Sequence, residues 1–425
     1  MHIIQPPLFD FEAFIVLEKQ ERLSVVLEAL DAEKLLSRLE RARWTGRKGY
    51  AVRGMWAALI AGVLHQCTSL AATVRLLESN KDIRTLCGFP TRDMVPSEDA
   101  LSRFLEKLVT HEELVKVCFD DLVERVRCLL PGFGRKLVVD STDIKAFSNG
   151  YRRHKSDPDA RWGVKKANGY YYSRGESDGS EGEGAKKGKR RDLYYWFGYK
   201  LHLLIDGVYE LPISCVVTSA NEADTTQMPV LLEQASLKRP ESRPEAVIAD
   251  KGYDSQKNNE LVYNEYHAAP IIPIKERKGM QLPDICNAKG TPTCSCGLEM
   301  VYRGRDGNYL KYRCPHVLGR GICSDLSLCT ASPYGYVLKL PIKDDVRRHP
   351  PLPRQTKKWE RLYRLRSSVE RVNSRLKELL GLGSITVRGI RKVMVRALLS
   401  LLVMIAAAVG MAQRNKLKEI RALVS

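Results

Sequence analysis

The sequence lacks the segments that direct a protein to a membrane or out of the cell. Its first residues, MHIIQPPLFDFEAF, do not follow the basic-then-apolar order of a signal peptide. The longest apolar run, Ala397 to Ala412, is shorter than the roughly 20 residues that a helix needs to span a bilayer. This run predicts a buried helix instead, and we expect a soluble, intracellular protein. No internal repeat is present either.

The eleven cysteines do not indicate a disulfide scaffold, because that class consists of short secreted chains and this chain has 425 residues. Five of them have apolar neighbours and are typical of core thiols: Cys67, Cys87, Cys118, Cys128 and Cys215. The other six lie between Cys286 and Cys329 and need a separate explanation.

Acidic residues are too few to balance the basic ones. There are 69 Lys and Arg against 50 Asp and Glu, which gives a formal net charge of +19. Such an excess favours a polyanionic partner, and nucleic acid is the commonest one. An acidic membrane surface is the rival partner. The length allows two or three domains with a substantial core.

The N-terminal part has the periodicity of helices. Apolar residues recur every three or four positions in residues 11–30 and 52–79. Ser97 is placed as an N-cap, with two acidic residues in the turn that follows. We expect an all-helical domain over residues 1–134. Its candidates for DNA contact are Trp44, Arg47 and Lys48, although their spacing is not diagnostic.

The pattern then changes to strands. Short apolar runs at 135–140, 195–206, 209–220, 246–250 and 268–275 alternate with a helical segment after residue 224. They predict an α/β fold, a mixed sheet flanked by helices, over 135–275 and again over 346–425. Residues 151–192, rich in charge, Gly and Ser, predict a flexible basic loop. Its runs YRRHK and KKGKRR are either solvated or in contact with phosphates.

Two apolar runs end on an aspartate. Asp140 closes the first run, and Asp250 closes the run AVIAD. Ligands collect at the carboxyl ends of strands in α/β sheets, so the two side chains are candidates for one site. A capping role in the turn that follows is the alternative for each of them. Asp143 and Asp254, slightly later in the chain, are alternative acids.

A third carboxylate lies on a helical segment near the C-terminus. At about 100° per residue, Tyr363, Arg366, Glu370 and Lys377 share one narrow stripe beside an apolar face. This is also the pattern of an ordinary salt-bridged helix. Two aspartates and a glutamate that converge would hold two hard divalent cations, such as Mg2+ or Mn2+, through oxygen ligands. The neighbouring Arg366 and Lys377 would bind DNA phosphates.

These residues resemble the DDE transposases of bacterial insertion sequences, which have an RNase H-like core. The helical segment matches that group's Tyr-x2-Arg-x3-Glu-x6-Lys pattern without a gap. VVDSTD, ADKGYDS and the connection TSANEADTTQMPVLL look like the group's strands and linker. The resemblance runs from about Arg135 onwards. Less distinctively, the helical part over residues 1–134 is similar to the DNA-binding domains that precede this core, which implies that it binds DNA.

The resemblance implies cleavage at the ends of a mobile element and transfer of the freed 3′ hydroxyl to target DNA. Asp140, Asp250 and Glu370 would be the catalytic, metal-binding acids. Tyr363, Arg366 and Lys377 would hold DNA. Terminal inverted repeats and target DNA would be the partners, a homodimer would pair two ends, and the bacterial cytoplasm, with its nucleoid, would be the location. A nuclease that does not join strands and a catalytically inactive DNA-binding regulator are the alternatives.

The insertion over 276–345 carries the remaining cysteines. Zinc favours four ligands from C-x2-4-C pairs, but the pairs here are spaced differently. A structural zinc site at Cys296, Cys314, Cys323 and Cys329 is one hypothesis. A β-rich insertion with free thiols is the other. His202 alternates with apolar residues and is expected in the core of the sheet rather than in catalysis.

Overall fold

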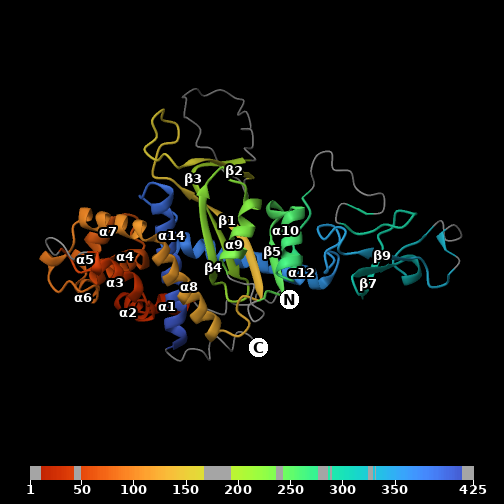
Figure 1. The fold of residues 1–425 in the computed structure, drawn as a ribbon, viewed down its shortest axis with the longest axis horizontal. Helices are drawn as coiled ribbons and strands as arrows, with labels where there is room; N and C mark the ends of the chain where they lie inside the picture. Colours follow the sequence, from red (N-terminus) through yellow and green to blue (C-terminus); the bar gives the residue numbers. More distant parts are fainter. Residues whose placement is uncertain are drawn as a thin grey trace, which may run out of the picture.

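The computed structural model describes residues 11–42, 49–166, 193–235, 243–275, 286–287, 290–323, 329–330 and 332–413. Its N-terminal part is built of helices (Figure 1). These are α1 (Phe11–Val16), α2 (Lys19–Ala29), α3 (Glu33–Arg41), α4 (Val52–Leu64), α5 (Leu70–Ser79), α6 (Lys81–Leu86), η1 (Arg92–Met94), α7 (Glu98–Thr110) and α8 (Glu112–Leu129). The hydroxyl of Ser97 accepts a hydrogen bond from the N–H of Ala100, so it caps α7 as the sequence predicts.

The helix α14 (Ile390–Met411) joins these helices to the rest of the protein. It packs against α2, α4, α7 and α8 on one side and against β4 of the sheet on the other. Within the described residues it is the helix long and apolar enough to cross a bilayer, yet 89% of its most apolar stretch is buried inside the protein. One continuous hydrophobic cluster therefore extends from the N-terminal helices into the sheet. The predicted division of the chain into domains stays a prediction.

The central sheet is mixed, as the sequence predicts. Its strands are β1 (Lys136–Lys145), β2 (Arg161–Lys166), β3 (Leu193–Asp206), β4 (Pro212–Ser219), β5 (Ala246–Ala249) and β6 (Ala269–Ile271). They lie in the order β2-β3-β1-β5-β6, with β4 also paired to β3. β1 runs antiparallel to β3 and parallel to β5, and β5 is parallel to β6. Flanking segments are η2 (Asp224–Thr226), α9 (Gln227–Gln234), η4 (Lys251–Tyr253), α10 (Gln256–Glu260) and the π-helical η5 (Leu261–Glu265).

Two strand predictions need correction. β1 does not end at Asp140 but continues to Lys145, because β3 remains its partner as far as Gly198. The strands approach so closely there that a Cβ on Gly198 would lie 2.1 Å from the carbonyl oxygen of Ile144. The expected loop from residue 151 also contains β2, because Trp162 packs its ring on Phe197 of β3. Residues 167–192, with the run KKGKRR, lie outside the described residues.

The helical segment that carries Glu370 is continuous but irregular. It consists of α12 (Lys357–Tyr363), the 3-10 turn η7 (Arg364–Arg366), α13 (Ser367–Ser374) and the π-helical turn η8 (Arg375–Leu379). The turns at both ends change the angle per residue, so the regular projection used on the sequence does not hold beyond α13. Val369, Val372 and Leu376 are fully buried and fix the segment against the sheet.

The cysteine-bearing insertion contains a separate three-stranded antiparallel sheet (Figure 1). Its strands are β7 (Val301–Asp306), β8 (Tyr309–Arg313) and β9 (Val337–Pro341), and the short turn η6 (His316–Leu318) follows β8. A small hydrophobic cluster of its own, which includes Met300, Leu310, Tyr312 and Ile342, stabilises this sheet.

Candidate active site

Parallel pairing places the two strand aspartates beside each other. The register between β1 and β5 ends with Val139 opposite Ala249, and Asp140 and Asp250 are the next residue in each chain segment. Neighbouring strands lie about 4.8 Å apart, so the two carboxyl groups leave the sheet at adjacent points. Both side chains are half-buried. One oxygen of Asp250 accepts a hydrogen bond of 2.7 Å from the N–H of Gly252, so this residue also has the capping role considered above.

Burial makes Asp140 a weak acid for its type. The pKa of its carboxyl is raised to about 7, first by burial and then by the negative charges of Asp250 and Asp224, while Arg366 opposes the shift. Ionisation of the Asp140 carboxyl without a nearby cation is therefore unfavourable in free energy. The arrangement favours a bound cation, which would relieve the repulsion between the acids.

Asp224, on the turn η2, is a member of this cluster that sequence reasoning missed. Its Oδ1 accepts hydrogen bonds from Ser141 Oγ at 3.2 Å and from Lys200 Nζ at 3.0 Å. His202 is fully buried beside it, with Nε2 2.9 Å from Thr218 Oγ1. Burial lowers the pKa of His202 to about 4, so the imidazole is neutral and fits the core role expected from the sequence.

Glu370 lies near the aspartates but is engaged with an arginine. Its Oε1 accepts a hydrogen bond of 2.7 Å from Arg366 Nη2, one turn earlier. Arg366 and Tyr363 both lie within electrostatic range of Asp140 and of Glu370. The Tyr363 ring stacks on Trp359 at a centroid distance of 4.9 Å. Arg366 thus interacts with Glu370 through a hydrogen bond and with Asp140 through its charge.

A buried glutamate holds the helix that carries Glu370. Glu210, just before β4, is 2% exposed and binds two arginines of the segment. Arg371 Nε donates to its Oε1 at 2.7 Å, and Arg375 Nη2 donates to its Oε2 at 2.7 Å. These are two of the basic residues that point away from the Glu370 stripe. Their charges bind Glu210 and so hold the helical segment in place.

Asp143, the alternative to Asp140, is committed to two lysines. Lys165 Nζ and Lys377 Nζ bind its Oδ1 at 2.7 Å and 3.2 Å. Hydrogen bonds and charge from these lysines lower the pKa of Asp143 to about 2, against the opposing effect of burial. The predicted DNA contact Lys377 is thus held by a carboxylate on β1.

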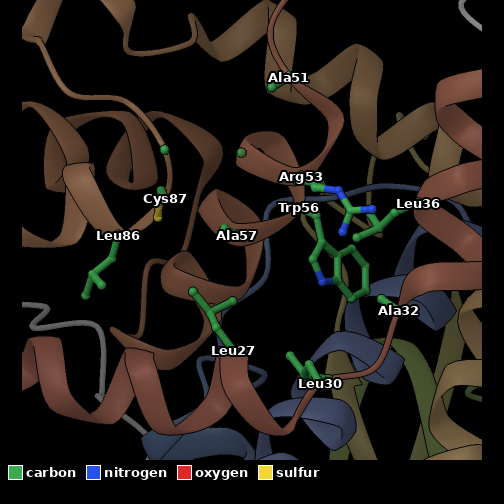
Figure 2. A pocket seen from close by; sticks show the side chains of 12 residues that line it. Leu27, Leu30, Ala32, Leu36, Ala51, Arg53, Trp56, Ala57, Leu86 and Cys87 are labelled. Carbon is green, nitrogen blue, oxygen red and sulfur yellow. The ribbon is translucent and has the colours of Figure 1, made fainter.

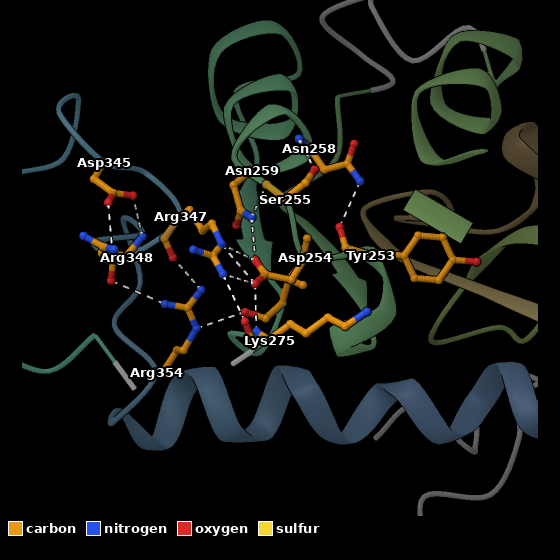
Figure 3. A network of polar contacts seen from close by, with 11 residues as sticks. Tyr253, Asp254, Ser255, Asn258, Asn259, Lys275, Asp345, Arg347, Arg348 and Arg354 are labelled. Atoms are coloured by element: carbon orange, nitrogen blue, oxygen red, sulfur yellow. Dashed lines mark hydrogen bonds and ion pairs between the residues drawn. The ribbon is translucent and has the colours of Figure 1, made fainter. Parts of the chain in front are cut away.

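Asp254, the alternative to Asp250, is fully buried in a different network (Figure 3). The guanidinium of Arg347 binds it through Nε at 3.0 Å and through Nη2 at 2.7 Å. The N–H of Lys275 donates to it at 2.8 Å. Arg354 stabilises the same network, because it donates hydrogen bonds to the carbonyl oxygens of Arg347 and Ile272. Asp254 therefore joins the end of the insertion to the loop after Asp250.

The three carboxylates suit a hard cation, although in this structure they do not all converge on one point. Asp140, Asp250 and Glu370 all offer carboxylate oxygens, the ligands that Mg2+ prefers. Within the described part of the chain, no three His, Cys, Asp or Glu side chains converge closely enough to hold a metal ion. Glu370 would have to leave Arg366 to complete such a site.

The structure brings together two of the four cysteines of the predicted zinc site. Cys296 Sγ lies 3.1 Å from Cys323 Sγ and also 3.1 Å from Cys294 Sγ, which was not in the predicted set. Cys314 is buried in the small sheet. His316, whose Nδ1 lies 3.2 Å from the backbone nitrogen of Cys323, is beside the sulfurs. The zinc site stays a prediction.

The other candidates from the sequence lie elsewhere. Trp44, Arg47 and Lys48 are outside the described residues. A pocket of about 360 Å³ opens among α2, α4 and α6, and Figure 2 shows the apolar side chains of Leu27, Leu30 and Trp56 on its walls. No catalytic acid lines this pocket.

Comparisons with known proteins identify the family of this chain. A family model described as "Transposase DDE domain" matches residues 131–406, and a model described as "Transposase domain (DUF772)" matches residues 10–107. A solved synaptic complex of piggyBac transposase with hairpin DNA is similar over 100% of this chain and 80% of that chain, with 12% identity and a TM-score of 0.39. That likeness is too low to support an argument. Among curated proteins, no match was found. Both family models describe transposases and the first covers more than half of the chain, which therefore belongs to the DDE-domain transposases.

Proposed function

We propose that this transposase cleaves DNA at the ends of its own element and joins the freed ends to target DNA. Asp140, Asp250 and Glu370 would hold Mg2+ or Mn2+. The observation that carries this assignment is the parallel register of β1 and β5, which sets Asp140 and Asp250 side by side at the end of their pairing. The raised pKa of Asp140 supports it, because isolated carboxylates are unstable there.

Divalent ions, when bound, would activate the attacking oxygen and stabilise the leaving oxygen of an in-line phosphoryl transfer. The chain's own residues would position the DNA. Arg366 can exchange Glu370 for a phosphate oxygen, since a guanidinium binds either anion. Lys377 can likewise exchange Asp143 for a phosphate. Tyr363, stacked on Trp359, presents a rigid hydroxyl beside the acids.

Strand transfer requires two element ends, so we propose a homodimer in the synaptic complex. The helical N-terminal part, which matches its own transposase domain, would bind the terminal inverted repeats. Cys294, Cys296 and Cys323 lie together, although they do not form a closed metal site among the described residues. They would have to rearrange to bind a structural zinc ion, with His316 or with Cys314 and Cys329 of the set predicted from spacing as further ligands. A nuclease that cuts without joining is the second candidate, and an inactive DNA-binding regulator is the third.

An assay with an end-bearing oligonucleotide, Mg2+ and a target plasmid separates these functions. Cutting with joining supports the transposase, cutting alone supports the nuclease, and binding alone supports the regulator. Asp140→Asn, Asp250→Asn and Glu370→Gln should each lower the rate by about 100-fold or more, as loss of one group that stabilises the transition state does. Glu360→Gln, an exposed carboxylate on the same helical segment, is the matched control and should keep activity. Wild-type rates in any of the three variants would remove that residue from the site.

A further inference from the structure

Aromatic rings gather on the surface beside β2. Tyr151 is 86% exposed, and Phe147 and Trp162 are exposed as well. Together with Phe197 of β3 these residues form what we call the aromatic ledge. Exposed aromatic rings that occur together on a soluble protein mark an interaction site more often than isolated ones do.

Three rings of the ledge pack against one another in a row, each tilted on the next. Tyr151 lies 4.8 Å from Trp162, and Trp162 lies 5.6 Å from Phe197, measured between centroids. The loop that carries Tyr151 is fixed to the sheet, because Tyr199 donates a hydrogen bond of 2.6 Å to the buried Asp157. A Cβ on Gly150 would lie 2.6 Å from the Phe197 ring, so the backbone itself rests on the row. The outermost ring is thus held in place with one face turned to solvent.

Positive charge surrounds these rings. Lys155 Nζ lies 5.1 Å from the Phe197 centroid, and the Arg388 guanidinium carbon lies 5.1 Å from that of Phe147. Residues 145–165 contain six Lys and Arg against two Asp, and Asp157 is buried. Arg152 and Arg153 directly follow Tyr151 in the chain and are exposed. The ledge therefore combines flat apolar faces with cations that suit a chain of phosphates.

We propose that the aromatic ledge binds a DNA strand whose bases are unpaired. The inference rests on the proposed function in taking DNA as the ligand. A duplex buries its base faces and offers only phosphates, whereas an unpaired base can stack on Tyr151 while the arginines hold the backbone. A purely electrostatic site would not need exposed rings.

The ledge lies further along β3, the strand that pairs with β1 at Asp140. Asp140 is opposite Leu203 on β3, whereas Lys145 is opposite Gly198, the residue after Phe197. Six residues of strand span about 20 Å. This is about six nucleotides at the spacing of 3.4 Å in a DNA strand. An unpaired strand that leaves the cleavage site can reach the ledge without crossing the core.

The test compares three DNA probes by fluorescence anisotropy at one salt concentration, in EDTA so that cleavage takes no part. The probes are a single strand, the same strand with abasic sites, and a hairpin duplex of equal charge. Wild-type protein should prefer the base-bearing strand. Tyr151→Ala should weaken binding of that strand by roughly 5- to 150-fold, which corresponds to ~1–3 kcal/mol for one stacked base, and should leave abasic binding unchanged.

Two variants control for folding and for nonspecific binding of DNA to exposed aromatic rings. Tyr151→Phe keeps the ring and should bind as wild type does. Tyr309→Ala removes a tyrosine that is 47% exposed on the distant small sheet and should have no effect. Equal wild-type affinity for the abasic and base-bearing strands would overturn the proposal. So would a Tyr151→Ala variant that changes the oligomeric state but not the affinity, which would assign the ledge to a second copy of the chain. Failure of cleavage in Mg2+ would refute the proposed function and leave this binding result intact.

Discussion

Removing the carboxylate of Glu210 should destabilise the protein far more than removing an exposed carboxylate on the same helical segment. Glu210 is 2% exposed and accepts from both Arg371 and Arg375. In Glu210→Ala, the Arg375 side chain, which is 12% exposed, would lose its hydrogen bond to the Glu210 carboxylate. The loss of a hydrogen bond between charged groups costs ~1.5–3 kcal/mol. Arg371 is half-exposed and can bind water, so its loss adds at most ~1 kcal/mol.

Glu210→Ala should thus lower the free energy of unfolding by about 3 kcal/mol in total. Glu210 has a φ of 56°, in the left-handed region, but alanine carries the same Cβ, so backbone strain cancels in the comparison. With an m-value of about 3 kcal/mol/M or more, the urea midpoint should fall by roughly 0.5–1 M.

The assay is equilibrium unfolding in urea followed by circular dichroism. Glu360→Ala is the matched control, because its pair with Arg364 is exposed on both sides and spans one turn. Such pairs contribute about 0.3–0.5 kcal/mol, so its midpoint should barely move. Equal midpoints for the two variants would refute the role of Glu210 as an anchor of the helix that carries Glu370.

Two further predictions concern ionisation and metal binding. Because the pKa of Asp140 is raised to about 7, the stability it contributes is present below pH 4 and is lost as pH rises through 7. Metal-free protein should therefore melt at a lower temperature at pH 8 than at pH 5, and Mg2+ should raise the melting temperature more at pH 8. Asp140→Asn should reduce both the pH difference and the Mg2+ effect. If that variant responds to pH and Mg2+ as wild type does, the assignment of both effects to Asp140 is contradicted. Protein purified from zinc-containing medium should hold about one zinc ion by elemental analysis. Cys296→Ser should lose it and Cys128→Ser, an exposed thiol elsewhere, should keep it, whereas zinc-free wild type would refute the site.

Local patterns predicted what depends on neighbouring residues in the chain. The apolar run before Asp250 predicted a buried strand, and β5 ends one residue before that aspartate. The mixed sheet followed from the order of such runs. Ser97 was predicted as a cap because its hydroxyl acts within one turn. In each case the interactions that decide the structure span only a few residues.

Tertiary pairing decided what the sequence pattern could not. β1 continues past Asp140 only because β3 accompanies it. Asp224 joins the site because η2 folds back over β3, where Lys200 and Ser141 reach it. The acid is visible in the stretch TSANEADTTQMPVLL, but no local periodicity marks it. Asp143 binds Lys377, and Glu210 binds Arg371 and Arg375, all from more than 150 residues away, so these contacts required the fold.

The anchor at Asp254 has a consequence for how this chain can vary. The segment that enters the insertion passes Ile272 and Lys275, and the segment that leaves it passes Arg347 and Arg354. Hydrogen bonds from Arg347 to the carbonyl oxygen of Lys275 and from Arg354 to that of Ile272 hold these two segments together at the base of the insertion. Everything between them can be lengthened, shortened or exchanged while the ends stay in register. We therefore expect the insertion to be replaceable, and foreign domains grafted between residues 276 and 345 should leave Asp140, Asp250 and Glu370 in place.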